Sequence, residues 1–163
     1  MPIASEDFRA ALRQFPSGVT IVTIKAGDAV HGLTVSAFAS ISPDPPLVAV
    51  IVDRRHKAHA LLEQPGASFA VNILRHDQLE LSNRFAWVKD EDRFAAGDWT
   101  TAETGAPVLR DALAWLDCRL QDRLAAGTHT IYTGLVEASH SASDGTPLVY
   151  WNRGYRRLEA ERA

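Results

Sequence analysis

The sequence is poor in cysteine and has no long hydrophobic run. Its single cysteine, Cys118, excludes an internal disulfide framework and a zinc site built from cysteines. Apolar and polar residues alternate around Cys118, so we expect a small buried hydrophobic side chain there rather than a reactive thiol. No stretch approaches the roughly 18 apolar residues that a membrane span needs. The first residues carry neither a basic region nor an apolar signal core, so we expect a cytoplasmic protein.

Neither sign of charge predominates in the sequence. The formal net charge is −3 at pH 7, and no cluster of Lys and Arg stands apart from acidic neighbours. Nucleic acid and anionic membranes are therefore not expected as partners. With 163 residues, of which 46% are hydrophobic and 23% are charged, the chain has the composition of an ordinary globular protein. We expect one domain over residues 1–163.

Several common catalytic signatures are absent from the sequence. No Gly-x-Gly-x-x-Gly follows a predicted strand and no Walker-type loop is present, so neither a Rossmann domain nor a P-loop is expected. The sequence shows no paired carboxylates and no Ser-His-Asp or Cys-His arrangement. The protein is therefore not expected to perform acid–base chemistry of its own.

Hydrophobic periodicity predicts many short strands and few helices. Ser5 and the two acids after it begin a helix that ends at Pro16. Further helices are expected over 58–64 and 77–85, with Asp77 as a cap, and a long ordered loop over 90–107. Strands are expected over 19–25, 30–34, 47–52, 68–72, 113–121, 129–138, 148–151 and 155–158. Because strands and helices do not alternate regularly, the pattern favours a mainly β fold, an antiparallel barrel with helical excursions.

Three of these strands carry finer expectations. The continuous apolar run 47–52 predicts a strand buried on both faces. Gly134 indicates a β-bulge or a close backbone contact. Alternation over 113–121 predicts one face with Leu116, Cys118 and Leu120 and an opposite face with Asp117, Arg119 and Gln121.

The most informative segment is 32–42, where small and hydroxyl-bearing residues predominate: Gly32-Leu33-Thr34-Val35-Ser36-Ala37-Phe38-Ala39-Ser40-Ile41-Ser42. It lies between two strand-like runs and precedes Pro45-Pro46. Backbone N–H groups and hydroxyls with little side-chain bulk around them suit close approach of a flat, phosphorylated ligand. A polar barrel loop that binds nothing is the alternative.

An ordered set of short motifs runs through most of the chain. In sequence order, the motifs are Phe15-Pro16-Ser17-Gly18-Val19-Thr20, segment 32–42, Phe69-Ala70-Val71-Asn72, Phe85-Ala86, Asp92-Arg93-Phe94, Gly105-Ala106-Pro107-Val108-Leu109, Gly127-Thr128-His129-Thr130 and Pro147-Leu148-Val149-Tyr150. Over residues 8–158 the set resembles the short-chain flavin reductases. The resemblance implies their fold, the FMN-binding split barrel with Greek-key topology.

The resemblance also implies an activity, which is that of an NAD(P)H:flavin oxidoreductase. Such an enzyme reduces FMN or FAD with NADH or NADPH and supplies reduced flavin to a flavin-dependent monooxygenase; the family members are homodimers. Hydride passes from nicotinamide C4 to flavin N5, and the protein contributes alignment and electrostatics. The alternatives are a flavin- or haem-binding split barrel that does not use nicotinamide, and a pure interaction module.

Two early segments are candidate flavin contacts. The resemblance places segment 32–42 around the flavin ring and ribityl chain, and the candidates are Thr34, Val35, Ser36, Ala37, Phe38 and Ser40. The turn before helix 58–64 offers cations near a helix start, where an anion is favoured, and the candidates are Asp53, Arg55, His56 and Lys57. The family usually carries Ser-x-Thr here, whereas this chain carries His56 and His59. A solvated basic turn is the alternative; no metal is expected, because His56 and His59 lack a third ligand at a fixed spacing.

Later segments supply the remaining candidates. In the resembled enzymes the segment that matches Asn83, Arg84 and Phe85 packs near the flavin, although Arg84 could instead pair with a local acid such as Glu80 or Asp92. The C-terminal Tyr150, Arg153 and Tyr155 suit either a dinucleotide lying over a flavin or an oligomer interface.

His129 is the candidate catalytic residue. The resemblance places it on the nicotinamide side of the flavin, opposite the segment that holds the flavin, with Thr128 where the family usually has aspartate. A plain surface histidine is the alternative.

Overall fold

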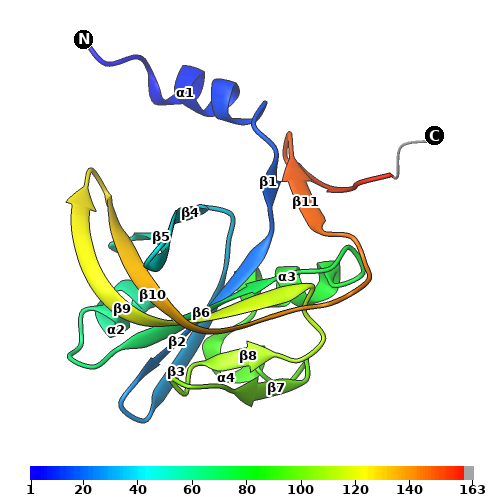
Figure 1. Cartoon of the computed structure of the whole chain (residues 1–163). Helices are drawn as coiled ribbons and strands as arrows, with labels where there is room; N and C mark the ends of the chain where they lie inside the picture. The colour runs from blue at the N-terminus through cyan, green and yellow to red at the C-terminus, as the bar shows by residue number, and fades with distance from the viewer. Residues whose placement is uncertain (160–163) are drawn as a thin grey trace.

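Seven antiparallel strands form the main sheet, in the order β3-β2-β6-β9-β10-β5-β4 (Figure 1). A computed structural model describes residues 1–159 of the chain, without the side chains of residues 90 and 91. The strands of the main sheet are β2 (Thr20–Ala26), β3 (Ala29–Val35), β4 (Phe38–Pro43), β5 (Pro46–Asp53), β6 (Ser68–Ile73), β9 (Ala114–Ala126) and β10 (His129–Ser141). One smaller sheet contains β1 (Ser17–Gly18), β11 (Leu148–Trp151) and β12 (Gly154–Arg157). Another pairs β7 (Trp99–Thr101) with β8 (Pro107–Leu109). The mainly β prediction is confirmed.

Helices are short and lie between the strands. The helices are α1 (Ser5–Leu12), α2 (Lys57–Leu62), α3 (Leu79–Trp87) and α4 (Asp90–Arg93). The predicted start of α1 at Ser5 is confirmed. The predicted cap at Asp77 is wrong, because α3 begins at Leu79 and its N-cap is Gln78. Asp77 instead forms an ion pair with Arg75.

The two larger clusters of buried residues lie on opposite faces of β2. Because side chains alternate along a strand, Val22 and Ile24 pack into a core with α2, β5 and β10, whereas Ile21 packs with Phe85 of α3 and Leu148 of β11. Cys118 is fully buried in the first core cluster, as predicted. Burial raises the pKa of the Cys118 thiol to about 12, with the nearby carboxylates adding to the shift.

Asp117 lies on the strand face opposite Cys118, as predicted, and on that face it is fully buried and accepts hydrogen bonds from the Thr104 N–H and hydroxyl. Two details of the prediction are wrong. The predicted loop over 90–107 contains α4 and β7. Strand β5 is not buried on both faces: Val48, Val50 and Val52 lie in the core, but Ile51 is 37% exposed.

Gly134 is both a bulge and a close contact, as the sequence indicates. The register between β9 and β10 shifts between Thr133 and Gly134. A Cβ at Gly134 would lie 2.4 Å from Phe69 Cζ and 2.9 Å from Cys118 Cβ, both in the buried core.

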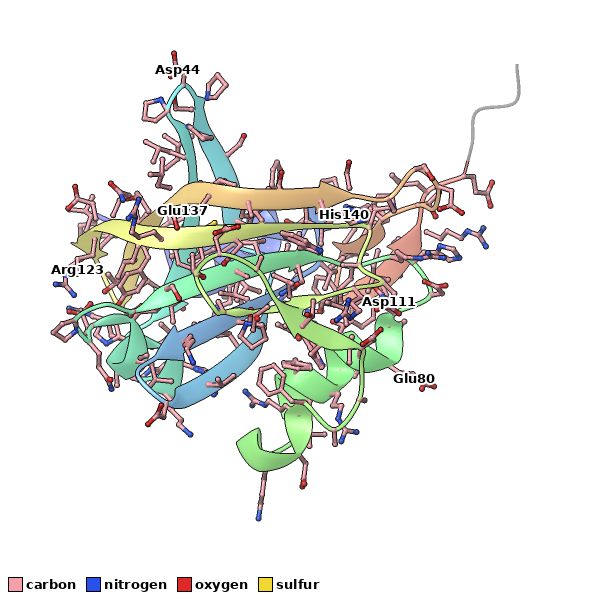
Figure 2. All side chains as sticks on the ribbon, turned by 60° about the horizontal axis from the view of Figure 1, so that its bottom comes forward. Asp44, Glu80, Asp111, Arg123, Glu137 and His140 are labelled. Atoms are coloured by element: carbon pink, nitrogen blue, oxygen red, sulfur yellow. The ribbon has the colours of Figure 1, made fainter. Side chains whose placement is uncertain are left out.

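Two elements extend away from the sheet. Helix α1 lies beyond the end of β1, at the top of Figure 1, and none of its residues is buried. The β4–β5 hairpin stands out from the sheet with Asp44 at its tip (Figure 2). Strand β4 has no buried residue either.

Candidate functional site

A cavity of about 590 Å³ lies where α1, the β3–β4 connection, β5 and the β11–β12 hairpin meet. Four segments that are far apart in the sequence form its walls. The cavity is lined by Arg9, Leu12, Arg13, Phe15, Ser17, Ser36, Ala37, Phe38, Ala39, Ala49, Ile51, Tyr150, Trp151, Asn152 and Arg153. Its lining is mainly apolar and aromatic, with polar groups at a few places. This is the composition of a typical small-molecule site.

The floor of the cavity comes from the small-residue segment and β5. The chain leaves β3 at Val35 and turns back at Ser36 and Ala37 into β4. The Ile51 N–H donates to the Ala37 carbonyl at 3.1 Å, which fixes the connection against β5. Because the side chains of Ala37, Ala39 and Ala49 are methyl groups, the backbone is accessible to a flat ligand. The Ser36 hydroxyl provides a polar group beside it.

The opposite wall comes from the C-terminal hairpin. Tyr150 and Trp151 lie in β11, with exposures of 40% and 37%. The hairpin is tied to α1, because the Asn152 N–H donates to the Arg13 carbonyl at 3.1 Å and Trp151 Nε1 donates to the Gln14 carbonyl at 3.2 Å. These bonds fix α1 as the third wall of the cavity.

The predicted phosphate turn does not line this cavity. In that turn Arg55 donates to both carboxylate oxygens of Asp53, from Nε at 3.1 Å and from Nη2 at 2.6 Å. The hydrogen bonds from the Arg55 side chain and backbone N–H hold the pKa of Asp53 well below its usual range. Arg55 therefore already has an anionic partner. His56 serves as the N-cap of α2, the role for which Ser and Thr are more usual.

His129 lies beside the phosphate turn. It pairs in register with Asp53 across β10 and β5, and the Arg54 N–H donates to the Thr128 carbonyl at 3.1 Å. The His129 side chain is exposed, and its Nδ1 lies 2.9 Å from the Thr128 hydroxyl. The structure therefore places His129 and Lys57 at the same end of β5, rather than on opposite sides of the predicted site.

A third group of predicted residues forms a hydrogen-bonded cluster around α3. The Tyr155 hydroxyl donates to Asn83 Oδ1 at 3.2 Å and lies 2.9 Å from the Ser82 hydroxyl. The Thr34 hydroxyl donates to the Ser82 carbonyl at 2.6 Å. The Tyr155 ring contacts Tyr150 edge to face, with ring centroids 5.4 Å apart. This cluster connects the end of β3 to the hairpin that walls the cavity.

Phe85 and Arg84, two further residues predicted to contact the flavin, instead contact other parts of the chain. Phe85 is 1% exposed and packs edge to face against Phe94 in the second core. Arg84 donates to the Asp92 and Arg93 carbonyls, so it joins α3 to α4 through backbone oxygens rather than through a carboxylate.

The structure thus separates the predicted site residues. Ser36, Ala37, Phe38, Tyr150 and Arg153 line one cavity. Asp53, Arg55, His56, Lys57 and His129 lie together at the far end of β5. Val35 is buried in the first core and Ser40 is exposed in β4; neither lines the cavity.

Sequence reasoning missed the contribution of α1. Arg9 and Arg13 both line the cavity, as do Leu12 and Phe15. The available signal was the spacing of the two arginines by four residues, which places them on one face of a helix. For the hairpin wall of the cavity, a second signal was the Asn152-Arg153 pair, which occupies a turn position that usually favours glycine.

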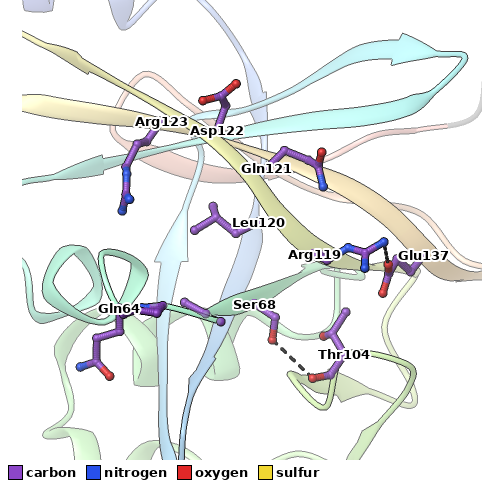
Figure 3. A pocket seen from close by; sticks show the side chains of 12 residues that line it. Gln64, Ser68, Thr104, Arg119, Leu120, Gln121, Asp122, Arg123 and Glu137 are labelled. Atoms are coloured by element: carbon purple, nitrogen blue, oxygen red, sulfur yellow. Dashed lines mark hydrogen bonds and ion pairs between the residues drawn. The ribbon is translucent and has the colours of Figure 1, made fainter.

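A second cavity, of about 480 Å³, lies between the start of β6 and the β9–β10 hairpin (Figure 3). Both of its arginines form ion pairs, Arg119 with Glu137 and Arg123 with Glu63. None of the predicted site residues lines it. The candidate site is therefore the cavity between α1, β5 and β11.

Comparisons with known proteins show what the whole chain is similar to. The model of the "Flavin reductase like domain" family matches residues 12–159. The chain is 42% identical over 153 residues to the reductase component of 4-hydroxyphenylacetate 3-monooxygenase from Thermus thermophilus, covering 94% of this chain and 96% of that protein.

Two solved structures have the same fold. An NADH:FAD oxidoreductase of Streptomyces globisporus, in complex with NAD and FAD fragments, superposes with a TM-score of 0.89 at 30% identity, covering 100% of this chain and 99% of that chain. A flavin reductase complexed with NADP+ superposes with a TM-score of 0.86 at 34% identity, covering 95% and 98%.

Proposed function

Because this chain belongs to the flavin reductase like domain family and has its split-barrel fold, we propose that it is an NAD(P)H:flavin oxidoreductase. The observation that carries the proposal is the cavity with its floor of small residues. Segment 36–39 and Ala49 form a surface with little side-chain bulk, and Phe38, Tyr150 and Trp151 supply flat aromatic groups. A flavin ring needs flat walls and polar partners at its edge, and this lining provides both.

The chemistry of the proposed reaction comes from the bound flavin and nicotinamide. When bound, a flavin would supply N5 as the hydride acceptor and a nicotinamide would supply C4 as the donor, and the protein would align the two rings. The cavity suits this task because its lining combines small and aromatic side chains with a few polar groups. Ser36 and the backbone of Ala37 and Phe38 are the proposed contacts of the ring edge.

We place the flavin phosphate toward the turn between β5 and α2. Ile51 lines the cavity and Asp53 begins the turn two residues later, so a ligand that lies along β5 extends from one to the other. Lys57 is the first residue of α2 in this turn, and it is the cation that we assign to the phosphate.

His129 is the proposed contact of the nicotinamide nucleotide. It is exposed beside this turn, and an imidazole can donate a hydrogen bond to a carboxamide or a phosphate. Because His129 pairs with Asp53, it lies near the proposed flavin phosphate as well. His129→Ala should therefore weaken the binding of both the nicotinamide nucleotide and the flavin. A substitution on the far side of the site should not have this double effect.

The proposal is tested by anaerobic reduction of flavin. Wild-type protein mixed with FMN or FAD should bleach the visible flavin absorption when NADH or NADPH is added. His129→Ala should slow the bleaching or raise the KM for NADH by roughly 10- to 100-fold, the scale of a lost charge-assisted hydrogen bond. Flavin that binds but stays oxidised with either nicotinamide would instead show a flavoprotein without reductase activity.

The proposed product is reduced flavin for a partner monooxygenase. Relatives include reductase components of two-component monooxygenases, such as the protein from Thermus thermophilus.

None of the helices within residues 1–159 is long and apolar enough to cross a membrane.

We further propose that the protein is a homodimer. Helix α1 exposes Phe8 at 53% and Leu12 at 53%, and the β4–β5 hairpin exposes Ile41 at 51%. Both elements extend from the sheet without cover from the described part of the chain. A second copy would bury these side chains and close the side of the cavity that α1 and β4 border.

A further inference from the structure

The rim of the candidate cavity is positively charged in a chain whose overall charge is negative. Arg9, Arg13 and Arg153 line the cavity, and no carboxylate lines it among the described residues. The whole chain has a formal net charge of −3. Cations that line a concave, partly apolar site raise the local concentration of anions there. This rim therefore differs in charge from the rest of the molecule.

The three arginines are held together by backbone contacts. Arg9 and Arg13 lie four residues apart, on the same face at the end of α1. The hydrogen bond from the Asn152 N–H to the Arg13 carbonyl brings the hairpin turn, and thus Arg153, next to that helix end. Among the described residues, none of the three arginines forms an ion pair with a carboxylate. Their guanidinium groups are thus not already neutralised, in contrast to Arg55.

The backbone conformation of Arg153 opposes folding rather than favouring it. Trp151 and Gly154 pair across the hairpin, so Asn152 and Arg153 are the two turn residues, with φ of 47° and 62°. A two-residue turn with positive φ at both positions favours Asn followed by Gly, and this chain has Arg at the second position. A side chain with a Cβ costs free energy in this left-handed region. Strain at a residue that lines a cavity is a feature of ligand sites.

We propose that Arg9, Arg13 and Arg153 bind the pyrophosphate of a dinucleotide substrate. This inference rests on the proposed function, in which the flavin ring occupies the cavity floor and its first phosphate points toward Lys57. The arginines lie at the α1 and β11–β12 side of the cavity, away from that turn. Guanidinium groups match phosphate oxygens through paired N–H donors. Because the two phosphates of FAD are directly linked and the first is placed at Lys57, the pyrophosphate beside the arginines is that of the nicotinamide dinucleotide.

Three variants test the assignment: Arg153→Gly, Arg13→Gln and Arg9→Gln. Each is titrated calorimetrically with FAD, FMN and NAD+, and its Tm is measured. Arg110→Gln is the matched control, because Arg110 is also exposed and pairs with Asp98 outside the cavity. We expect each cavity variant to weaken the affinity for NAD+ about tenfold, with the affinities for FMN and FAD unchanged. A weakened affinity for FAD with unchanged affinity for NAD+ would contradict the assignment.

Arg153→Gly has a second readout. Since glycine relieves the strain at positive φ, its Tm should stay level or rise while dinucleotide affinity falls. The proposal is overturned if the variants bind NAD+ as the Arg110→Gln control does, or if Arg153→Gly lowers the Tm and leaves the affinity for NAD+ unchanged. A wild-type protein that binds flavin without reducing it would instead overturn the proposed function.

Discussion

Tyr132 shows how one buried polar group sets a pH limit on stability. Its side chain is fully buried in β10, and its hydroxyl donates to Glu63 Oε1 at 2.7 Å, which joins β10 to the end of α2. Burial, followed by the hydrogen bond to the Glu63 carboxylate, raises the pKa of Tyr132 above its usual value near 10. The native protein therefore keeps the phenol proton at a pH where the unfolded chain loses it.

We predict that this raised pKa makes the protein less stable in alkali. Below about pH 10 both states hold the proton, so the contribution of Tyr132 is complete; above it the unfolded state binds fewer protons and stability falls as pH rises. Tyr132→Phe should cost about 1 kcal/mol at neutral pH, since Glu63 keeps Arg123 as a partner at 3.0 Å, and should flatten the decline in alkali. Denaturant unfolding at several pH values measures both effects. An equally steep alkaline decline in Tyr132→Phe would assign it to other groups.

Single residues were predicted best where their role depends on local sequence. The buried state of Cys118 follows from alternation alone, and so does the special position of Gly134. The burial of Asp117 does not, because its partner Thr104 comes from a distant loop. The pairing of Arg55 with Asp53 was also invisible, because a turn geometry decides whether two neighbouring charges meet.

The β9–β10 hairpin is the element on which the main sheet depends, since it joins β6 to β5. Gly134 lets Phe69 of the neighbouring β6 strand pack against the backbone of β10. A methyl group there would overlap Phe69 Cζ, and Phe69 is fully buried in the core.

We predict that Gly134→Ala destabilises the protein by roughly 1–3 kcal/mol, the usual range for overpacking a core. Gly18→Ala is the matched control, because nothing lies within 4 Å of a Cβ at Gly18. Thermal unfolding of both variants measures the difference. Equal Tm values would mean that the β6–β10 contact is looser than the structure indicates.

Elements were predictable where periodicity was strong. The strands around Val22, Val50 and Phe69 lie within a residue or two of their predicted bounds, because continuous or alternating apolar runs specify them. Helix α4 and strand β7 were missed because both are short and polar in sequence. Packing of Phe94 and Trp99 against Phe85 stabilises that region, and such packing has no local signature.

At the scale of the whole molecule, the candidate site could be predicted only in part. Segment 32–42 pointed to a ligand from its own composition. The cavity also needs α1 and the hairpin after β11, which are more than a hundred residues apart in sequence and meet through the Asn152–Arg13 contact. The antiparallel fold class could be inferred from the strand pattern. Which segments come together as the walls of the cavity depends on the strand order of two separate sheets, the main sheet and the β1-β11-β12 sheet.

The exposed apolar side chains of α1 and the β4–β5 hairpin predict a dimer in solution. Light scattering should report about twice the chain mass of 17.8 kDa. Phe8→Glu together with Leu12→Glu places two charges in the proposed interface and should shift the protein toward the monomer. A wild-type protein that is monomeric yet fully active as a reductase would remove the second copy from the account of the site.

The measurement that tests the central claim most directly is anaerobic flavin reduction in a variant with a filled cavity. Ala37 is exposed on the cavity floor, so Ala37→Trp should leave the fold intact and occupy the space assigned to the flavin ring. Ala95→Trp adds the same bulk at an exposed alanine outside the cavity. We predict that NADH bleaches flavin with wild-type protein and with Ala95→Trp, while Ala37→Trp shows flavin affinity and reduction rate lowered by at least about tenfold. Unchanged flavin affinity and reduction rate in Ala37→Trp would contradict the account, because the reaction would then take place elsewhere on the molecule.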